Sequence, residues 1–475
     1  MTVAGQGVKI LVQVLSVVLL SRILTPGDYG LIAMVTAVIG VADIFRDLGL
    51  STAAVQARTL SERQRGNLFW INTALGLGLA VAAFCLAPVL AALYGRPELV
   101  GIGQVLALTF LLNGLATQYR ADLTRRLLFG RLAVADVVAA VSGLALALGV
   151  ALAGAGYWAL VVQQLGQYGV MLALVVAGGR WRPRLPSRRA EMGGLLRFGW
   201  HMVGTQVIGY VANNADSVVI GARFGAGPLG LYNRAFQLLM TPLTQVRAPI
   251  TQVALPVLAA VQDEARRLTR YVGQGQLALG YTLVAGLGLV AGTAPQLVSV
   301  LLGDAWQEAA PLLALLAVAG AVQTLGLANY WVYVACGLTG ALLRYSLIQA
   351  AVKIVCVLAG SSWGVVGVAA GYALAPLLTW PLSFWWLSRS TSLPMRPLVG
   401  SAARVLGVFV AVSVVSRSAA AAAPWSSPWA GLAAGVAAGA LAVALLYAVL
   451  APVRRDVRAV ARLGRQALSR VPAAA

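Results

Sequence analysis

The sequence predicts an all-α membrane protein whose chain crosses the bilayer about fourteen times. Of the 475 residues, 60% are hydrophobic and 10% are charged, whereas roughly a quarter of the residues in a soluble domain are charged. The mean hydropathy is +0.84. Apolar runs of about 20 residues, the length that a helix needs to cross a bilayer, follow one another along the chain. These observations indicate a polytopic helical bundle.

Each expected span is one apolar run bounded by polar or turn-forming residues. The first two runs flank the turn TPGDYG at 25–30. The opening segment MTVAGQGVK has neither a basic region nor a small-residue cleavage site, so we expect no signal peptide. The expected spans lie at 5–23, 29–50, 67–93, 98–118, 132–153, 157–178, 198–220, 229–255, 273–298, 308–335, 340–359, 363–387, 401–420 and 429–451.

Basic residues gather in every second connection between these spans. Such connections hold most of the 35 Lys and Arg residues, from Arg58, Arg63 and Arg65 in the first to the arginine-rich segment after 452. Basic connections face the cytoplasm, so the pattern predicts a multi-pass protein of the cytoplasmic (inner) membrane with both termini cytoplasmic. The net charge of +21 does not indicate nucleic-acid binding, because the basic residues alternate with apolar runs instead of forming one polar domain.

An internal repeat predicts two lobes of the same orientation. Because six spans separate the equivalent helices, the repeat is parallel, and the interface between its copies is the expected substrate path. The predicted parts are an N-terminal lobe at 1–180, a basic linker at 181–197, a C-terminal lobe at 198–388, two helices at 400–452 and a basic tail at 453–475. The matching residues are Gly27, Gly30 and Leu31 with Gly227, Gly230 and Leu231; Arg22 and Arg46 with Arg223 and Arg247; and Trp158 and Gly166 with Trp363 and Gly371.

Polar and charged residues inside the spans are the candidate functional residues. A charge at membrane depth costs several kcal/mol unless it faces a protein interior or a wet cavity. The candidate substrate-binding cations are Lys9, Arg46, Arg234, Arg247 and Lys353. The candidate ion-coupling carboxylates are Asp43, Asp47 and Asp216, and further polar residues of the expected lumen are Gln13, Asn213 and Gln237.

These side chains would form a wet, net cationic lumen if their helix faces converge between the lobes. Such a lumen suits a diphosphate or an acidic sugar, because Arg binds phosphate or carboxylate oxygens at two points and Lys acts as a point charge. Two structural alternatives stay open. Arg46 could form an ion pair with Asp43 or Asp47 that locks its helix to a neighbour, and Arg234 could extend to the outer membrane interface.

The sequence leaves alternatives open for energy coupling and for gating of the transport path. A buried carboxylate can titrate, so coupling to protons or sodium is one hypothesis and passive exchange is the other. Pro242, Pro249 and Pro256 favour bending of one helix, either as a gating hinge or as a static bend. The three cysteines and the single histidine have no metal-ligand spacing, so we expect neither a metal nor a cofactor.

Several segments resemble a known family of membrane transporters. They are LSRILTPGDYGLIAM at 20–34, FRDLGLSTAAVQ at 45–56, GYWALVVQQL at 156–165, NNADSVVIGARFGAGPLGLYNRA at 213–235 and WGVVGVAAGYAL at 363–374. Together they resemble Wzx-type polysaccharide flippases, the polysaccharide branch of the multidrug/oligosaccharidyl-lipid/polysaccharide exporter superfamily. The resemblance covers nearly the whole chain.

The resemblance implies both a fold and a function. The implied fold is a V-shaped core of two parallel six-helix repeats with two added C-terminal helices. The implied function is to move an undecaprenyl-diphosphate-linked oligosaccharide repeat unit across the membrane by alternating access, for surface polysaccharide biosynthesis. Membrane lipids and the polysaccharide polymerase machinery are the implied partners, and no nucleic acid is expected.

Three alternatives to this function remain at this point. A multidrug exporter of the same superfamily would share the fold, but its lumen is expected to be more acidic or aromatic, to suit organic cations. A peptidoglycan lipid-precursor flippase would also be cationic, and the motif at 22–34 favours the polysaccharide branch over it. A membrane enzyme acting on lipid-linked glycans would need a sizeable outer loop, whereas the expected outer loops are short.

Overall fold

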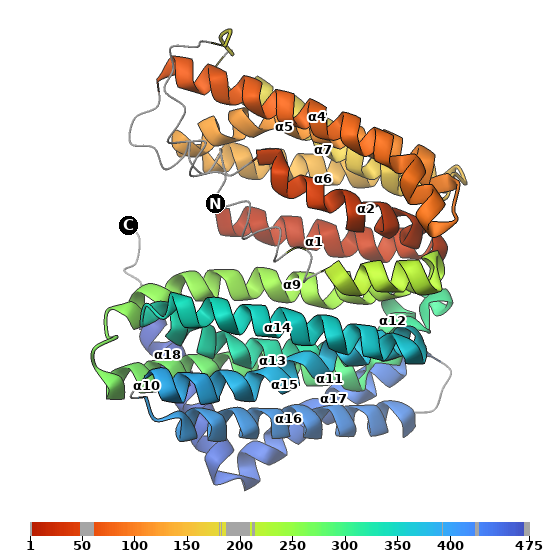
Figure 1. Ribbon diagram of the computed structural model, residues 1–475. Helices are drawn as coiled ribbons and strands as arrows, with labels where there is room; N and C mark the ends of the chain where they lie inside the picture. The colour runs from red at the N-terminus through yellow and green to blue at the C-terminus, as the bar shows by residue number, and fades with distance from the viewer. Residues whose placement is uncertain are drawn as a thin grey trace. The chain divides into compact units, whose positions relative to one another are not determined.

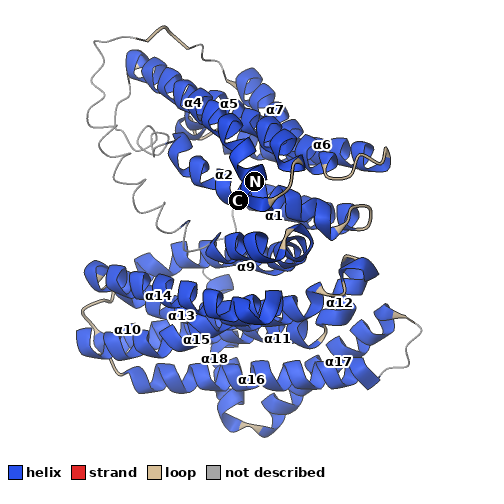
Figure 2. Cartoon of the chain, turned by 45° about the vertical axis from the view of Figure 1, so that its right-hand side comes forward, coloured by secondary structure: helices blue, strands red, loops and turns tan. Residues whose placement is uncertain are grey.

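The computed structural model describes residues 2–47, 61–179, 181, 183–186, 210, 214–391, 393–422 and 427–469. Every regular element in these ranges is a helix (Figure 2), which confirms the all-α class. Within the same ranges, nine helical segments are long and apolar enough to cross a membrane, and two of them, at 265–292 and 339–390, each contain successive helices. The chain is therefore a multi-pass membrane protein, while the predicted total of spans stays a prediction.

The chain divides into two compact units, Met1–Arg234 and Ala235–Ala475, which we call unit 1 and unit 2. The division lies within α9, so the first turns of that helix belong to unit 1. The predicted linker at 181–197 falls mostly outside the described residues, and the predicted lobe boundaries stay predictions. Unit 1 contains α1 (Thr2–Ser21), α2 (Pro26–Asp47), α4 (Glu62–Tyr94), α5 (Glu98–Arg125), α6 (Phe129–Leu152), α7 (Trp158–Gly178) and the start of α9 (Ala226–Ala259) (Figure 1).

Unit 2 contains the rest of α9 and all later elements. α9 is one continuous helix that contains Pro242, Pro249 and Pro256. The predicted bend at these prolines stays a prediction. After α9, unit 2 contains α10 (Ala265–Leu279), η1 (Gly280–Val284), α11 (Ala285–Gly292), α12 (Ala294–Leu301), η2 (Asp304–Trp306), α13 (Ala309–Ala335), α14 (Thr339–Gly360), η3 (Ser361–Trp363), α15 (Gly364–Ser390), α16 (Met395–Ala422), α17 (Pro428–Val449) and α18 (Ala451–Ser469).

Glycines let successive helices pack closely as hairpins. In the α4–α5 hairpin, a Cβ on Gly76 would lie 2.7 Å from the carbonyl oxygen of Phe110, and one on Gly114 would lie 2.6 Å from that of Asn72. In the α14–α15 hairpin, a Cβ on Gly371 would overlap the carbonyl of Cys356. Small residues matter here because helix association within lipid depends on close packing more than on the hydrophobic effect.

The same backbone turn ends α5 in unit 1 and α13 in unit 2. Leu127 follows α5 with φ 56°, and Gly337 follows α13 with φ 70°. In each turn, the next backbone N–H reaches back to a carbonyl: Leu128 N donates to Leu123 O at 2.9 Å, and Leu338 N donates to Tyr333 O at 2.8 Å. The α5–α6 and α13–α14 connections therefore have the same turn geometry.

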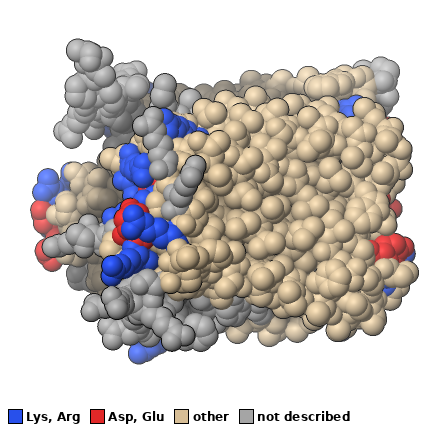
Figure 3. All heavy atoms as spheres, turned by 90° about the horizontal axis from the view of Figure 1, so that it is seen from above, with Lys and Arg blue, Asp and Glu red and all other residues tan. Residues whose placement is uncertain are grey.

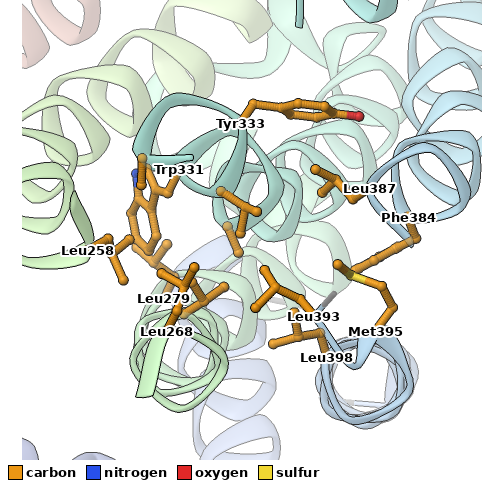
Figure 4. Close-up of a cluster of buried hydrophobic side chains, with 14 residues drawn as sticks. Leu258, Leu268, Leu279, Trp331, Tyr333, Phe384, Leu387, Leu393, Met395 and Leu398 are labelled. Atoms are coloured by element: carbon orange, nitrogen blue, oxygen red, sulfur yellow. The ribbon is translucent and has the colours of Figure 1, made fainter. Parts of the chain in front are cut away.

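A hydrophobic cluster joins α9, α10, α13, α15 and α16 in unit 2 (Figure 4). Trp331 is the largest side chain of the cluster and is 1% exposed. Its indole N–H donates to Thr251 Oγ1 of α9 at 3.2 Å. The labelled members are Leu258, Leu268, Leu279, Trp331, Tyr333, Phe384, Leu387, Leu393, Met395 and Leu398.

Charge is unevenly distributed over the surface. On the face seen in Figure 3, Lys and Arg gather toward one end, and the broad middle is formed by other residues. A wide band without charge suits the hydrocarbon core of a bilayer, and basic residues at one edge of it follow the usual asymmetry of membrane proteins. The cytoplasmic position of the basic connections stays a prediction.

Candidate functional site

Five of the predicted site residues cannot be placed. Lys9 belongs to α1, and Asp43, Arg46 and Asp47 belong to α2, but their side chains lie outside the described part of the structure. Asn213 lies outside the described residues altogether. Their roles, including the ion pair considered for Arg46, stay predictions.

In unit 2, two of the predicted cations lie at one tyrosine. Lys353 of α14 places its Nζ 4.5 Å from the ring centre of Tyr372 on α15. Arg247 of α9 donates to Thr324 of α13, and the adjacent Gln323 donates to the Tyr372 hydroxyl at 3.5 Å. Three helices therefore bring two positive charges and an aromatic ring together. We call Arg247, Gln323, Thr324, Lys353 and Tyr372 the Tyr372 cluster.

Arg247 is held by two neutral groups of α13. Its Nη2 donates to the Gly320 carbonyl oxygen at 2.7 Å and also to Thr324 Oγ1. Thr324 in turn donates to the same carbonyl at 2.6 Å. Gly320 allows this approach, because a Cβ at that position would lie 3.0 Å from Leu243, one turn before Arg247. Both groups orient the guanidinium without neutralising its charge.

The rest of the guanidinium keeps binding capacity. Arg247 Nε is buried and has no hydrogen-bond partner among the described residues. A buried N–H donor without a partner is costly, and such groups often mark a place where a ligand, an ion or water binds. The arrangement is suited to an anion that reaches Arg247 from the side not occupied by α13.

Tyr372 is itself positioned by α9 and α13. Gln323 Nε2 donates to its hydroxyl at 3.5 Å, and the ring of Phe236 packs edge-on against it at 6.0 Å between centroids. The face of the tyrosine ring attracts Lys353 through its quadrupole. This contact would hold the ammonium at one place without removing its charge.

Two further predicted polar residues are exposed. Gln13 on α1 and Gln237 on α9 both have exposed side chains. Near Gln13 on the same helix, Ser16 Oγ accepts a hydrogen bond of 2.7 Å from Gln163 Nε2 of α7. The role of both glutamines in a lumen stays a prediction.

Arg234 is buried in unit 1. It is 6% exposed, and its Cζ lies 3.4 Å from the ring centre of Tyr29 at the start of α2. An arginine that extended to the outer interface would be exposed at its guanidinium, so the structure favours an interior position. Whether that interior belongs to a substrate path stays a prediction.

Asp216 is a buried carboxylate of unit 1. It is 1% exposed. Its Oδ2 accepts a hydrogen bond from the hydroxyl of Tyr232 on α9, and its Oδ1 is buried without a hydrogen-bond partner among the described residues. The ion-coupling role expected for this residue stays a prediction.

The first turns of α2 and α9 make a reciprocal contact in unit 1. A Cβ on Gly30 would overlap the carbonyl of Ala226, and a Cβ on Gly230 would overlap the carbonyl of Pro26. Gly30 and Gly230 are matched positions of the predicted repeat, as are residues 26 and 226. Both contacts therefore join matched positions of the predicted repeat.

Sequence reasoning did not identify Tyr372, Gln323 or Thr324 as site residues. One signal was present for the last two, since the polar pair Gln323-Thr324 interrupts the apolar run ALLAVAGAV before it and LGLA after it. Polar side chains within a span are expensive enough to suggest a function. Tyr372 carried no comparable signal, because tyrosine is an ordinary residue of membrane helices.

Solved structures with the same fold are transporters. A structure of the lipid II flippase MurJ in an inward closed conformation matches with a TM-score of 0.72, at 10% identity, covering 94% of this chain and 99% of that one. An inward-facing multidrug resistance MATE family transporter of the MOP superfamily matches with a TM-score of 0.62, at 16% identity, covering 85% and 96%. At these identities the likeness establishes the fold.

Curated proteins extend the comparison to sequence. The chain is 25% identical over 393 residues to the lipopolysaccharide biosynthesis protein WzxC of Escherichia coli (strain K12), covering 81% of this chain and 77% of the relative. It is 28% identical over 287 residues to the teichuronic acid biosynthesis protein TuaB of Bacillus subtilis (strain 168), covering 60% and 59%. It is 27% identical over 310 residues to the succinoglycan biosynthesis transport protein ExoT of Rhizobium meliloti (strain 1021), covering 65% and 63%.

A family profile matches the chain directly. The profile is described as "Polysaccharide biosynthesis protein", and it aligns with residues 19–311. The aligned region begins in α1 and extends into α13, so it includes the α2–α9 contact and Arg247. Because the match covers more than half of the chain, this protein belongs to the polysaccharide biosynthesis protein family.

Proposed function

We propose that this protein is a flippase that moves undecaprenyl-diphosphate-linked oligosaccharide repeat units from the cytoplasmic to the outer leaflet of the cytoplasmic membrane, by alternating access. The product would supply surface polysaccharide biosynthesis. The observation that carries the proposal is the pair of cations at Tyr372, in a chain of the polysaccharide biosynthesis family. No cofactor is part of the proposal.

The chemistry of the Tyr372 cluster suits the charged end of this substrate. A diphosphate carries several acceptor oxygens, and charge-assisted hydrogen bonds from Arg and Lys are among the strongest that a protein makes to it. Arg247 is oriented by neutral partners and has a buried N–H donor left over, while Lys353 is held on an aromatic face. Both cations are therefore set up to bind an anion.

The relatives support the same class of substrate. Their names refer to the biosynthesis of lipopolysaccharide, teichuronic acid and succinoglycan, and one is called a transport protein. A solved structure with this fold is the lipid II flippase MurJ. We accordingly propose a transporter and not an enzyme, and we propose a polysaccharide polymerase as the partner that uses its product.

The proposed topology places both termini in the cytoplasm. It rests on the basic connections, which flank apolar helices on one side of the expected membrane. For energy coupling, we propose that Asp216 exchanges a proton or a sodium ion, because one of its buried carboxylate oxygens lacks a protein partner among the described residues. Flipping is measured for the parent and for Asp216→Asn, with and without an ion gradient. If neither protein flips faster with the gradient, passive exchange is favoured instead.

Transport in liposomes tests the proposal. The purified protein is reconstituted with a labelled undecaprenyl-diphosphate oligosaccharide from the same cell, and the fraction that becomes accessible from the opposite leaflet is measured. Protein-dependent flipping is expected. Lipid II and a fluorescent organic cation are run in parallel, since preferred transport of either one would place the protein with the corresponding alternative function.

Variants of the Tyr372 cluster connect transport to the site. Arg247→Glu and Lys353→Glu should each slow flipping at least about tenfold, since a hydrogen bond to a charged group contributes ~1.5–3 kcal/mol. Arg344→Glu is the matched control, because Arg344 lies on α14 with Lys353 but is exposed. Tyr372→Phe keeps the ring beside Lys353 and should transport better than Tyr372→Leu. Wild-type rates in both glutamate variants would rule out the Tyr372 cluster as the binding site.

A further inference from the structure

The last helix of unit 2 differs in character from the helices before it. Only Leu450 separates α18, at Ala451–Ser469, from the apolar helix α17. The sequence of α18, APVRRDVRAVARLGRQALS, alternates arginines with small and branched apolar residues. Figure 1 shows α18 beside α10, against which it packs. α18 therefore begins at the edge of the last apolar helix and continues as a strongly amphipathic one.

One face of α18 packs into unit 2. Val453 is 3% exposed and joins Val408 and Val412 of α16 in a small hydrophobic cluster. Val457, one turn further along, packs against the same cluster. This apolar face attaches α18 to the body of the unit.

A charged anchor sets the rotation of α18 about its own axis. Arg404 of α16 binds the carboxylate of Asp456 at two points, with Nε 2.9 Å from Oδ2 and Nη2 3.1 Å from Oδ1. The hydroxyl of Tyr281 donates to the same Oδ2 at 3.3 Å. Asp456 is only 8% exposed. Two-point binding of this kind fixes geometry as well as adding stability.

The opposite face of α18 presents arginines. Arg455, Arg458 and Arg462 are all exposed, and their spacing of three and four residues places them on one side of a helix. At about 100° per residue, that side is turned away from Val453 and Asp456. We call these three residues the arginine stripe. The anchor and the hydrophobic cluster together hold the arginine stripe outward.

We propose that the arginine stripe binds the anionic phospholipid headgroups of the leaflet at which α17 ends. The place of α18 in the chain supports a lipid partner, because its first residues come directly after a membrane-spanning helix. Charge complementarity supports an anionic lipid. Each basic residue next to a span raises the affinity for acidic headgroups about fivefold. The interaction would hold α18 along the membrane surface, and it does not depend on the proposed transport activity.

Hydrogen exchange of the full-length protein in lipid nanodiscs tests this interaction. Amide exchange in the peptides of α18 is compared between discs of phosphatidylcholine alone and discs that also contain phosphatidylglycerol. Exchange is expected to be at least about tenfold slower with the anionic lipid, as the sum of several such attractions. High salt should remove most of the difference, because exposed charges are screened within a Debye length of about 10 Å at 0.1 M salt.

Two variants separate the arginine stripe from a general effect of charge. Removal of the stripe in R455Q/R458Q/R462Q should abolish the lipid dependence of exchange in α18. The matched control R266Q/R270Q/R344Q removes the same number of exposed arginines from α10 and α14 and should preserve it. Equal exchange of the parent protein in both kinds of disc would overturn the proposal. Equal slowing by inorganic phosphate in phosphatidylcholine discs would also overturn it, because the ligand would then be a soluble anion.

Discussion

The guanidinium carbon of Arg234 lies 3.4 Å from the ring centre of Tyr29, which joins the first turns of α9 to the first turn of α2. Both side chains are buried, with exposures of 6% and 5%. A cation–π contact between desolvated groups contributes ~2 kcal/mol or more, compared with ~0.5–1 kcal/mol at an exposed site. This contact is therefore expected to stabilise unit 1 measurably.

Replacement of Tyr29 measures this contribution. Tyr29→Leu should lower the thermal unfolding temperature of the detergent-solubilised protein, because it removes the aromatic face beside a buried cation. Tyr29→Phe keeps that face and is the control, so it should unfold closer to the parent. If the leucine and phenylalanine variants unfold at the same temperature, the ring does not stabilise Arg234.

The reciprocal glycines of α2 and α9 predict a second pattern. Gly30→Ala and Gly230→Ala should each lower the yield of folded protein and its flipping rate, because the new methyl group overlaps a backbone carbonyl of the other helix. Gly27→Ala and Gly227→Ala are the matched controls. The space around Gly227 is open, and Gly27 has only the Thr25 hydroxyl oxygen at 3.7 Å.

The controls should be neutral or slightly stabilising, since alanine favours a helix over glycine by ~1 kcal/mol. Fluorescence-detected size-exclusion chromatography would measure the yield of all four variants. A loss of equal size in the two pairs would contradict the close α2–α9 contact.

The matched turns after α5 and α13 predict a stabilising substitution. Leu127 has φ 56°, a left-handed conformation that costs an L-residue other than glycine ~1–2 kcal/mol. Its side chain is 73% exposed, so little packing would be lost on replacement. Leu127→Gly should therefore raise the unfolding temperature, partly offset by the greater freedom of glycine in the unfolded chain.

The equivalent glycine provides the reverse experiment. Gly337, in the α13–α14 turn, has φ 70°. Gly337→Ala should therefore lower the unfolding temperature, because alanine is strained in this left-handed conformation. Differential scanning fluorimetry of both variants checks the pair. A destabilised Leu127→Gly protein would show that the leucine side chain contributes more than its backbone strain costs.

A buried ion-pair cluster at one end of unit 1 predicts a difference between two aspartates. Asp122 is 5% exposed and pairs with both Arg65 of α4 and Arg126, while Arg65 also stacks 4.5 Å from the ring centre of Trp181. Asp122→Asn should cost up to ~3–5 kcal/mol, because it removes the buried carboxylate that pairs with Arg65 and leaves that arginine, among the described carboxylates, only Glu62 at 3.8 Å.

Asp136 provides the comparison. It pairs with Arg120 at 3.0 Å, but both side chains are partly exposed, so Asp136→Asn should cost only ~0–1 kcal/mol. Urea or thermal unfolding of the two variants in the same detergent would measure the difference. Similar losses would mean that burial does not determine the strength of these pairs.

The candidate site contains residues that charge in the sequence can indicate and one that it cannot. Arg247 and Lys353 were predictable because a charge inside an apolar run is costly and needs a reason. Tyr372 was not, since neither its type nor its spacing distinguishes it from other tyrosines in membrane helices. Its importance comes from the approach of α9, α13 and α14 to one ring, which no local pattern describes.

The position of the Arg234 side chain also could not be decided from the sequence. Its position near the start of a helix allowed either an interior place or an extension to the membrane interface. Only packing against Tyr29 distinguishes these, and that packing depends on Gly30 and Gly230 letting α2 and α9 approach. The sequence did contain these glycines as a repeat, but their mutual contact is a property of the folded chain.

By itself, the sequence determined the helical membrane class and the alternation of basic connections, whereas the parallel repeat stays a prediction. The first two follow from periodicity and composition, because lipid forces the backbone into helices and charge out of the hydrocarbon. Only the tertiary structure decided that Arg247 and Lys353 share Tyr372, that Arg234 is buried, and that Arg404 anchors α18 with its arginine stripe outward. The physical reason is that these relationships join residues far apart in the chain, and their geometry depends on side-chain packing, which hydropathy does not encode.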